Sequence, residues 1–180
     1  MKFSSQYKLI VLIAIIFAIF YNISFFKNVI STYEPMGINI LYISSLAIVL
    51  VSIIVFIFTL FSSKYTTKPI LIITLMVSSF TAYFMDTYHV VIDHEMIRNS
   101  LQTNLSESSD LFSLKLVVYV LLLGILPSYL IYKTKINYRP FKKELLFKIS
   151  TLLISLSFIV ITILLFSKFY TSFFREHKPL

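Results

Sequence analysis

The sequence contains no cysteine and no tryptophan, and only 2 glycines and 5 prolines among its 180 residues. The lack of cysteine excludes disulfide bonds and thiolate metal sites. Because glycine and proline are scarce, long stretches can form uninterrupted helices. Acidic residues are also few: 8 stand against 16 lysines and arginines, so the chain carries a net charge of +8.

Apolar residues dominate what remains. The chain is 58% hydrophobic, and its mean hydropathy is +0.88. A soluble domain of this length cannot bury so much apolar surface, so the composition predicts a membrane protein with several spans. The positive charge lies in short segments between apolar runs, where it determines topology. We therefore expect no nucleic-acid partner.

Five apolar stretches are long enough to cross a bilayer as helices, because a span needs about 20 residues. None shows the polar alternation that barrel strands require. We therefore expect an all-α, polytopic membrane protein, with a periplasmic amphipathic helix between the third and fourth spans. The five spans are predicted near residues 9–26, 38–61, 70–85, 114–132 and 149–167.

The distribution of basic residues predicts the orientation. The N-terminus and the segments 62–69 and 133–148 together hold ten lysines and arginines and one acid, Glu144. Such segments remain in the cytoplasm. We therefore expect a cytoplasmic N-terminus and a periplasmic C-terminus, with residues 83–110 also outside, in the inner membrane of a Gram-negative bacterium.

Residues 83–110, which we call the polar segment, interrupt the apolar pattern. They contain five of the eight acids and two of the three histidines. Asp86 and Thr87 come where the third span ends, and there an acid can cap a helix or mark the edge of the membrane.

A helix is plausible from Asp93 onward, because acids near a helix N-terminus stabilise it. Residues four apart share a helix face, so Asn99, Thr103 and Glu107 form one polar stripe, nearly opposite an apolar stripe at 97, 101 and 105. An amide, a hydroxyl and a carboxylate suit a zwitterionic lipid headgroup. An ordinary amphipathic helix with a solvated face explains the same spacing.

The same segment contains His89, Asp93, His94 and Glu95, which are residue types that bind metals. His89 and Asp93 are four residues apart, but His94 and Glu95 would point elsewhere on a helix. Only two of these side chains could converge on one ion, so we predict no metal site in this chain.

Several stretches resemble one family, in their order and spacing over most of the chain. The first is FFK at 25–27. The others are SSKYTTKPIL at 62–71, SSFTAYFMDTY at 78–88, MIRNSLQTNLSESSDL at 96–111, LLLGILPS at 121–128 and TSFFREHKPL at 171–180. In these motifs the chain resembles the N-terminal membrane domain of the bacterial phosphoethanolamine–lipid A transferases, the group that includes the mobile colistin-resistance enzymes.

The resemblance implies five transmembrane helices and then a periplasmic catalytic domain with a threonine nucleophile and zinc ligands. It implies transfer of phosphoethanolamine from phosphatidylethanolamine to lipid A through a phospho-threonine enzyme, which produces polymyxin resistance. It also implies that Asn99, Thr103 and Glu107 bind the phosphoethanolamine headgroup. His89 departs from the family, which has glycine there.

The resemblance further divides the chain into a membrane domain at 1–167 and the start of a linker at 168–180. We expect the catalytic residues and the zinc to lie in a domain absent from these 180 residues, so the chain alone should be inactive. Thr103 matches a binding position and not the nucleophile. A stand-alone membrane scaffold or lipid-binding protein without chemistry remains the alternative. A transporter fits less well, because no ionisable residue lies in the middle of a span.

Overall fold

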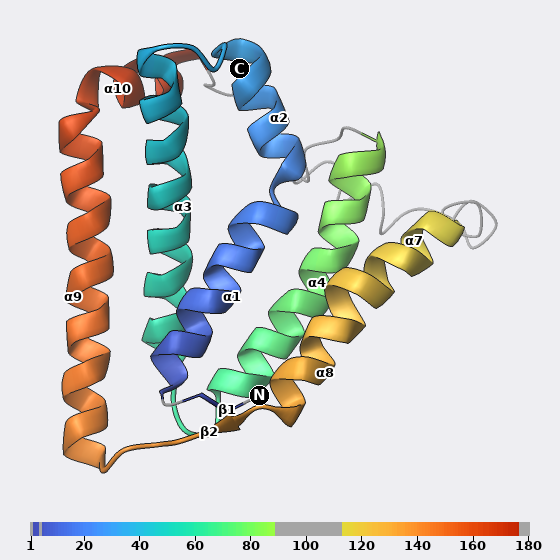
Figure 1. Ribbon diagram of the computed structural model, residues 1–180, viewed down its shortest axis with the longest axis vertical. Coiled ribbons are helices and arrows are strands. Elements are labelled where there is room, and N and C mark those ends of the chain that lie inside the picture. The colour runs from blue at the N-terminus through green and yellow to red at the C-terminus, as the bar shows by residue number, and fades with distance from the viewer. Residues whose placement is uncertain (1, 4, 89–112, 177–180) are drawn as a thin grey trace.

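The computed structural model describes residues 2, 3, 5–88 and 113–176, and within these ranges the chain is almost entirely helical (Figure 1). Two strands of two residues each are the exception. The elements are β1 (Lys2–Phe3), α1 (Gln6–Phe20), α2 (Ile23–Thr32), α3 (Ile38–Phe61), α4 (Thr67–Tyr88), α7 (Leu114–Tyr119), the π-helical segment η1 (Val120–Ile125), α8 (Leu126–Lys133), β2 (Lys135–Ile136), α9 (Phe141–Leu165) and α10 (Ser167–Glu176). The prediction of a helical protein is confirmed for this part of the chain.

Four helical stretches of the described chain are long and apolar enough to cross a membrane: α3, α4, the continuous run Leu114–Lys133 and α9. The pair α1 and α2 passes the same test together, although the two helices are bent by 57°. The described chain therefore holds four candidate spans, or five if the bent pair is one span. The spans predicted at 38–61 and 114–132 match closely, and the one at 70–85 lies inside α4.

The first span is not the continuous helix predicted at 9–26, because the chain breaks at Tyr21 and Asn22. The Asn22 side chain donates its Nδ2 to the carbonyl oxygen of Phe17 at 3.0 Å, which satisfies a carbonyl at the end of α1. Asparagine competes in this way with the helical backbone and favours helix ends. An apolar run therefore continues in the sequence where the helix itself stops.

The basic segment predicted as a loop at 133–148 is also shorter than expected. Only residues 134–140 separate α8 from α9, and α9 begins at Phe141 instead of 149. Pro140 precedes the helix, and Glu144 lies in its first turn, where a negative charge complements the positive end of the helix dipole. The apolar pattern did not predict this start of the helix, because its lysines are polar. Lysine is nevertheless a good helix former, so the helix extends through them.

The run from α7 to α8 is interrupted by η1 and by Pro127. In a regular helix the N–H at position 127 would bond to the carbonyl of Leu123, and proline has no N–H. The Tyr21 hydroxyl donates a hydrogen bond to that Leu123 carbonyl instead. The break after α1 and the irregular turn in the Leu114–Lys133 run are thereby connected to each other.

The helices form two groups joined by α1 (Figure 1). In one group α9 packs along α3, and in the other α4 packs along α7, η1 and α8; α1 packs against α3. Gly124 in η1 allows α4 to approach closely, because a Cβ atom there would lie 2.8 Å from the Ser79 Oγ atom.

The N-terminus and the segments 62–66 and 134–140 meet at one end of the bundle, which we call the basic end. Strands β1 and β2 pair there in parallel, with Lys2 opposite Lys135. The Lys148 Nζ atom donates to the Ser62 carbonyl oxygen at 2.9 Å, so the start of α9 also joins the end of α3. The segments that are rich in basic residues therefore gather at one end, as the orientation prediction requires.

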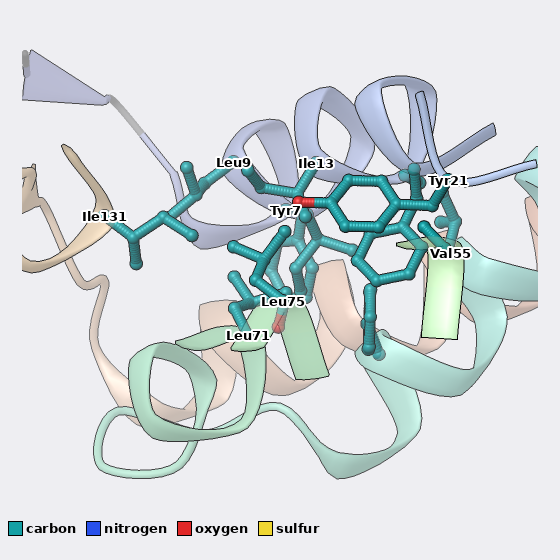
Figure 2. Close-up of a cluster of buried hydrophobic side chains, with 13 residues drawn as sticks. Tyr7, Leu9, Ile13, Tyr21, Val55, Leu71, Leu75 and Ile131 are labelled. Carbon is teal, nitrogen blue, oxygen red and sulfur yellow. The ribbon is translucent and has the colours of Figure 1, made fainter. Parts of the chain in front are cut away.

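Two clusters of buried apolar side chains hold the helices together. Figure 2 shows the larger one, in which Ile13 of α1 and Tyr21 just after it meet Val55 of α3 and Leu71 and Leu75 of α4. The smaller cluster joins α2, α3 and α10, with Val29, Leu46 and Tyr170 among its members. Many outward-facing side chains are also apolar, which is the pattern of a protein surrounded by lipid.

Candidate functional site

The predicted headgroup-binding residues Asn99, Thr103 and Glu107 lie outside the described residues, as do His89, Asp93, His94 and Glu95. What the structure describes is where the chain enters and leaves this region, at the end of α4 and at Ser113. The C-terminal end of α4 and the start of α7 both lie toward the end of the bundle away from the basic end (Figure 1).

Asp86, two residues before the end of α4, connects three helices. Its carboxylate accepts a hydrogen bond of 2.5 Å from the Ser24 hydroxyl of α2 and one of 3.2 Å from the Tyr119 hydroxyl of α7. The sequence predicted that Asp86 would cap a helix or mark the membrane edge. In the structure, both carboxylate oxygens accept hydrogen bonds from side chains of neighbouring helices. The residues after Tyr88 that Asp86 could cap lie outside the described ranges, so capping stays a prediction.

Ser113 connects the other boundary of the region to α4. Its Oγ atom lies 2.7 Å from the Tyr83 hydroxyl oxygen, and it also accepts a hydrogen bond of 3.1 Å from the Leu116 backbone N–H as the N-cap of α7. Serine is a favoured N-cap residue, so the sequence held a signal for the cap. It held none for the contact with Tyr83, which is 30 residues away.

Aromatic rings surround these hydrogen bonds. The Tyr83 ring lies 5.2 Å from that of Phe84, 6.1 Å from that of Tyr88 and 5.7 Å from that of Tyr119, each in an edge-to-face arrangement. Edge-to-face ring pairs add to the stability of a contact beyond the area they bury. The boundary of the predicted binding region is therefore built from tyrosines and one carboxylate, groups that attract a cation more readily than an anion.

The basic end contains a second polar network, which sequence reasoning missed. The Gln6 side chain, only 2% exposed, donates to Glu144 Oε1 at 2.7 Å and accepts from the Thr67 hydroxyl at 2.9 Å. The Arg139 backbone N–H donates to Glu144 Oε2 at 3.2 Å. Burial, and then the charge of Glu144, raise the pKa of the Tyr138 hydroxyl. The signal in the sequence was that Glu144 is a single acid among ten basic residues.

A groove with a volume of about 770 Å³ lies among α1, α3 and α9. We call it the α1–α3–α9 groove, and its lining is almost entirely apolar, with Lys8 at its edge. A smaller hollow of about 340 Å³ adjoins it and shares Ala18, Ile19 and Ala47 with it. Within the described ranges, no three histidine or acidic side chains lie close enough together to hold a metal ion.

Comparisons with known proteins agree with one another. The family model described as "Phosphoethanolamine transferase EptA/EptB" matches residues 50–180. The chain is 39% identical over 168 residues to the phosphatidylethanolamine transferase Mcr-2 of Escherichia coli, covering 93% of this chain and 31% of that protein. It is 36% identical over 177 residues to Mcr-1 of the same species, covering 98% of this chain and 32% of that protein.

A more distant relative, phosphoethanolamine transferase EptA of Escherichia coli K12, is 30% identical over 173 residues, covering 95% of this chain and 32% of EptA. Among solved structures, the integral membrane lipooligosaccharide phosphoethanolamine transferase A of Neisseria meningitidis superposes with a TM-score of 0.91 at 25% identity. That match covers 98% of this chain and 33% of the other. The chain thus spans about a third of the length of these relatives.

Proposed function

Because this chain belongs to the phosphoethanolamine transferase EptA/EptB family, as its N-terminal membrane domain, we propose that it positions the lipid substrates of such an enzyme. In this proposal phosphatidylethanolamine is the donor and lipid A is the acceptor. The enzyme lies in the inner membrane, with the polar segment and the C-terminus on the periplasmic side. The observation that carries the proposal is the superposition of nearly the whole chain on an integral membrane phosphoethanolamine transferase.

We propose that the transfer chemistry belongs to a soluble domain of the kind found in this family. There a threonine oxygen attacks the donor phosphorus, and the bond to the diacylglycerol oxygen breaks. A lipid A phosphate oxygen then attacks the same phosphorus and releases the threonine. Zinc would supply charge stabilisation in that domain. In the part of this chain that the structure describes, no cluster of side chains fits a metal, so we assign no step here to zinc.

The contribution of this chain is then to hold the donor headgroup near the reacting groups. Holding two reactants in place makes their encounter effectively unimolecular. We assign the headgroup ammonium to Glu107, and the phosphate oxygens to Asn99 and Thr103. The contacts of Tyr83, Asp86 and Ser113 support this assignment, because they tie together the helices on either side of the stretch that carries these residues.

The test is a pair of substitutions, Glu107→Ala and Glu107→Gln, made in a full-length enzyme that contains this domain. We expect both variants to be expressed normally and to modify lipid A poorly, as measured by mass spectrometry of extracted lipid A. Glu34→Gln, an exposed acid between α2 and α3, is the control and should leave transfer intact. Normal lipid A modification by both Glu107 variants would refute the headgroup role.

The division of labour has a test of its own. The 180-residue chain, purified and reconstituted with phosphatidylethanolamine and lipid A, should transfer no phosphoethanolamine. A natural protein that stops after Leu180 and still performs transfer would contradict the proposal. A protein of that length that binds lipid without transfer would support the alternative of a membrane scaffold.

A further inference from the structure

The α1–α3–α9 groove is a second candidate lipid site, separate from the polar segment. Its lining comes from Tyr7 to Ile19 on α1, Ala47 to Val55 on α3 and Thr151 to Phe158 on α9. The two α9 hydroxyls in it are already bonded within their own helix: Thr151 donates to the Phe147 carbonyl at 2.8 Å, and Ser155 donates to the Thr151 carbonyl at 2.9 Å. The groove therefore offers hydrocarbon contacts along its length.

The setting of the groove favours lipid hydrocarbon as the occupant. The groove has a volume of about 770 Å³, is partly open, and lies among helices that include the candidate spans α3 and α9, so an acyl chain of the surrounding bilayer can enter it. The adjoining hollow extends this space toward Ile23, Phe26 and Lys27 on α2. A thin flexible acyl chain fits this space, and packing contacts with the groove lining hold it there. A second helix on the same face is an outcome that the test below distinguishes.

The charge at one end of the groove selects the headgroup. Lys8 lies at the edge of the groove in the first turn of α1, and its side chain is exposed. Within the described ranges its ammonium forms no ion pair. Glu144, the one acid of the basic end, already accepts hydrogen bonds from Gln6 and from the Arg139 backbone. The surrounding excess of basic residues favours an anionic headgroup over a zwitterionic one.

We propose that the α1–α3–α9 groove binds one anionic phospholipid of the leaflet at the basic end, with its acyl chains along the groove and its phosphate at the Lys8 ammonium. This lipid differs from the proposed donor in charge and in position, because the end of α4 and the start of α7, which flank residues 89–112, lie toward the opposite end of the bundle (Figure 1). The proposal does not depend on the transferase role and holds if the chain is only a membrane scaffold.

The test compares two lipids that differ only in their headgroup. The purified chain is exchanged into detergent with equal amounts of palmitoyl-oleoyl phosphatidylglycerol and palmitoyl-oleoyl phosphatidylethanolamine, and retained lipid is counted by native mass spectrometry. We expect phosphatidylglycerol to be retained preferentially. Lys8→Gln should lower its retention about fivefold, the effect of losing one lysine–phosphate attraction, and Lys8→Arg should restore it. Lys64→Gln removes the same charge at the same end, outside the groove lining, and should lower retention much less than Lys8→Gln.

A steric variant tests the acyl-chain path. Ala47→Trp on α3 should fill the groove and reduce retention of both lipids, whereas Val77→Trp, at an exposed position of α4 outside the groove, should not. If Ala47→Trp fails to fold, the Lys8 and Lys64 pair still decides. Any of three results would overturn the proposal. The two lipids could be retained equally, Lys8→Gln and Lys64→Gln could have equal effects, or the chain could prove to be a dimer that dissociates on Ala47→Trp.

Discussion

Tyr83 on α4 and Ser113 at the start of α7 bring their hydroxyl oxygens to 2.7 Å, although 30 residues separate them in the sequence. This contact joins the two helices that flank the region of the predicted headgroup residues. Ser113 also caps α7, so one side chain contributes to both the helix start and the junction.

The double role of Ser113 predicts an order of effects. Tyr83→Phe removes one hydrogen bond and should lower the free energy of unfolding by about 1 kcal/mol. Ser113→Ala removes that bond and the cap, and should cost about 2 kcal/mol. Denaturant unfolding in detergent micelles, followed by circular dichroism, measures both. Equal losses for the two variants would show that the cap contributes nothing here.

The bridge formed by Asp86 predicts coupling between helices. Asp86→Ala leaves the Ser24 and Tyr119 hydroxyls without their acceptor, and it should destabilise the protein by about 1–3 kcal/mol. In a full-length enzyme it should also reduce lipid A modification, because the boundary of the polar segment loosens.

A double-mutant cycle of Asp86→Ala with Tyr119→Phe separates the energy of the hydrogen bond between these two side chains from the other effects of each substitution. We expect a coupling of about 0.5–1.5 kcal/mol in unfolding free energy, because each change removes the same hydrogen bond. Strict additivity of the two substitutions would contradict the contact. Tyr65→Phe, whose ring is 81% exposed, controls for loss of a tyrosine hydroxyl and should be neutral.

Close packing of η1 on α4 predicts a steric effect at Gly124. A Cβ atom there would lie 2.8 Å from the Ser79 Oγ atom and 3.1 Å from the Met76 sulfur. Gly124→Ala should therefore cost about 1–3 kcal/mol through overpacking. Ser79→Ala removes the nearest atom, so the double variant should recover part of the loss. A double variant less stable than Gly124→Ala alone would exclude this explanation.

The network at the basic end predicts that Glu144 stabilises the fold through hydrogen bonds. Glu144→Ala leaves the buried Gln6 amide without its 2.7 Å acceptor and should cost about 1–3 kcal/mol. Glu34→Ala, an exposed acid, should cost less than about 0.5 kcal/mol. Thermal unfolding in detergent measures both, and a similar melting temperature for the two variants would refute the role of the network.

Much of the fold could be predicted from the sequence, because apolar runs of span length admit few other structures. The helix at 38–61 was predicted within its observed bounds for that reason. The break at Asn22 and the early start of α9 at Phe141 were missed, because hydropathy reports burial in lipid and not the hydrogen bonds that end a helix. Asparagine at the break and proline before α9 were the local signals that were available.

The candidate site also has one part that the sequence could suggest and another that it could not. Residues spaced by four on one helix, such as Asn99, Thr103 and Glu107, can be proposed from periodicity, but they lie outside the described residues and that prediction remains untested. Contacts between distant helices, such as that of Asp86 with Ser24, could not be predicted, since no single sequence records which helices become neighbours. Only the rarity of acids marked Asp86 and Glu144 as unusual.

The basic end also constrains how the protein assembles. Strand β1 pairs with Lys135–Ile136, and Gln6 bonds to a residue 138 positions later. These contacts cannot form until α3, α4 and the Leu114–Lys133 run have been synthesised. Strand β1 therefore stays unpaired through most of membrane insertion, and its pairing with β2 is a late step. Contacts of such long sequence separation are also the slowest to form, so variants that weaken this closure should accumulate as chains that have inserted but not yet packed.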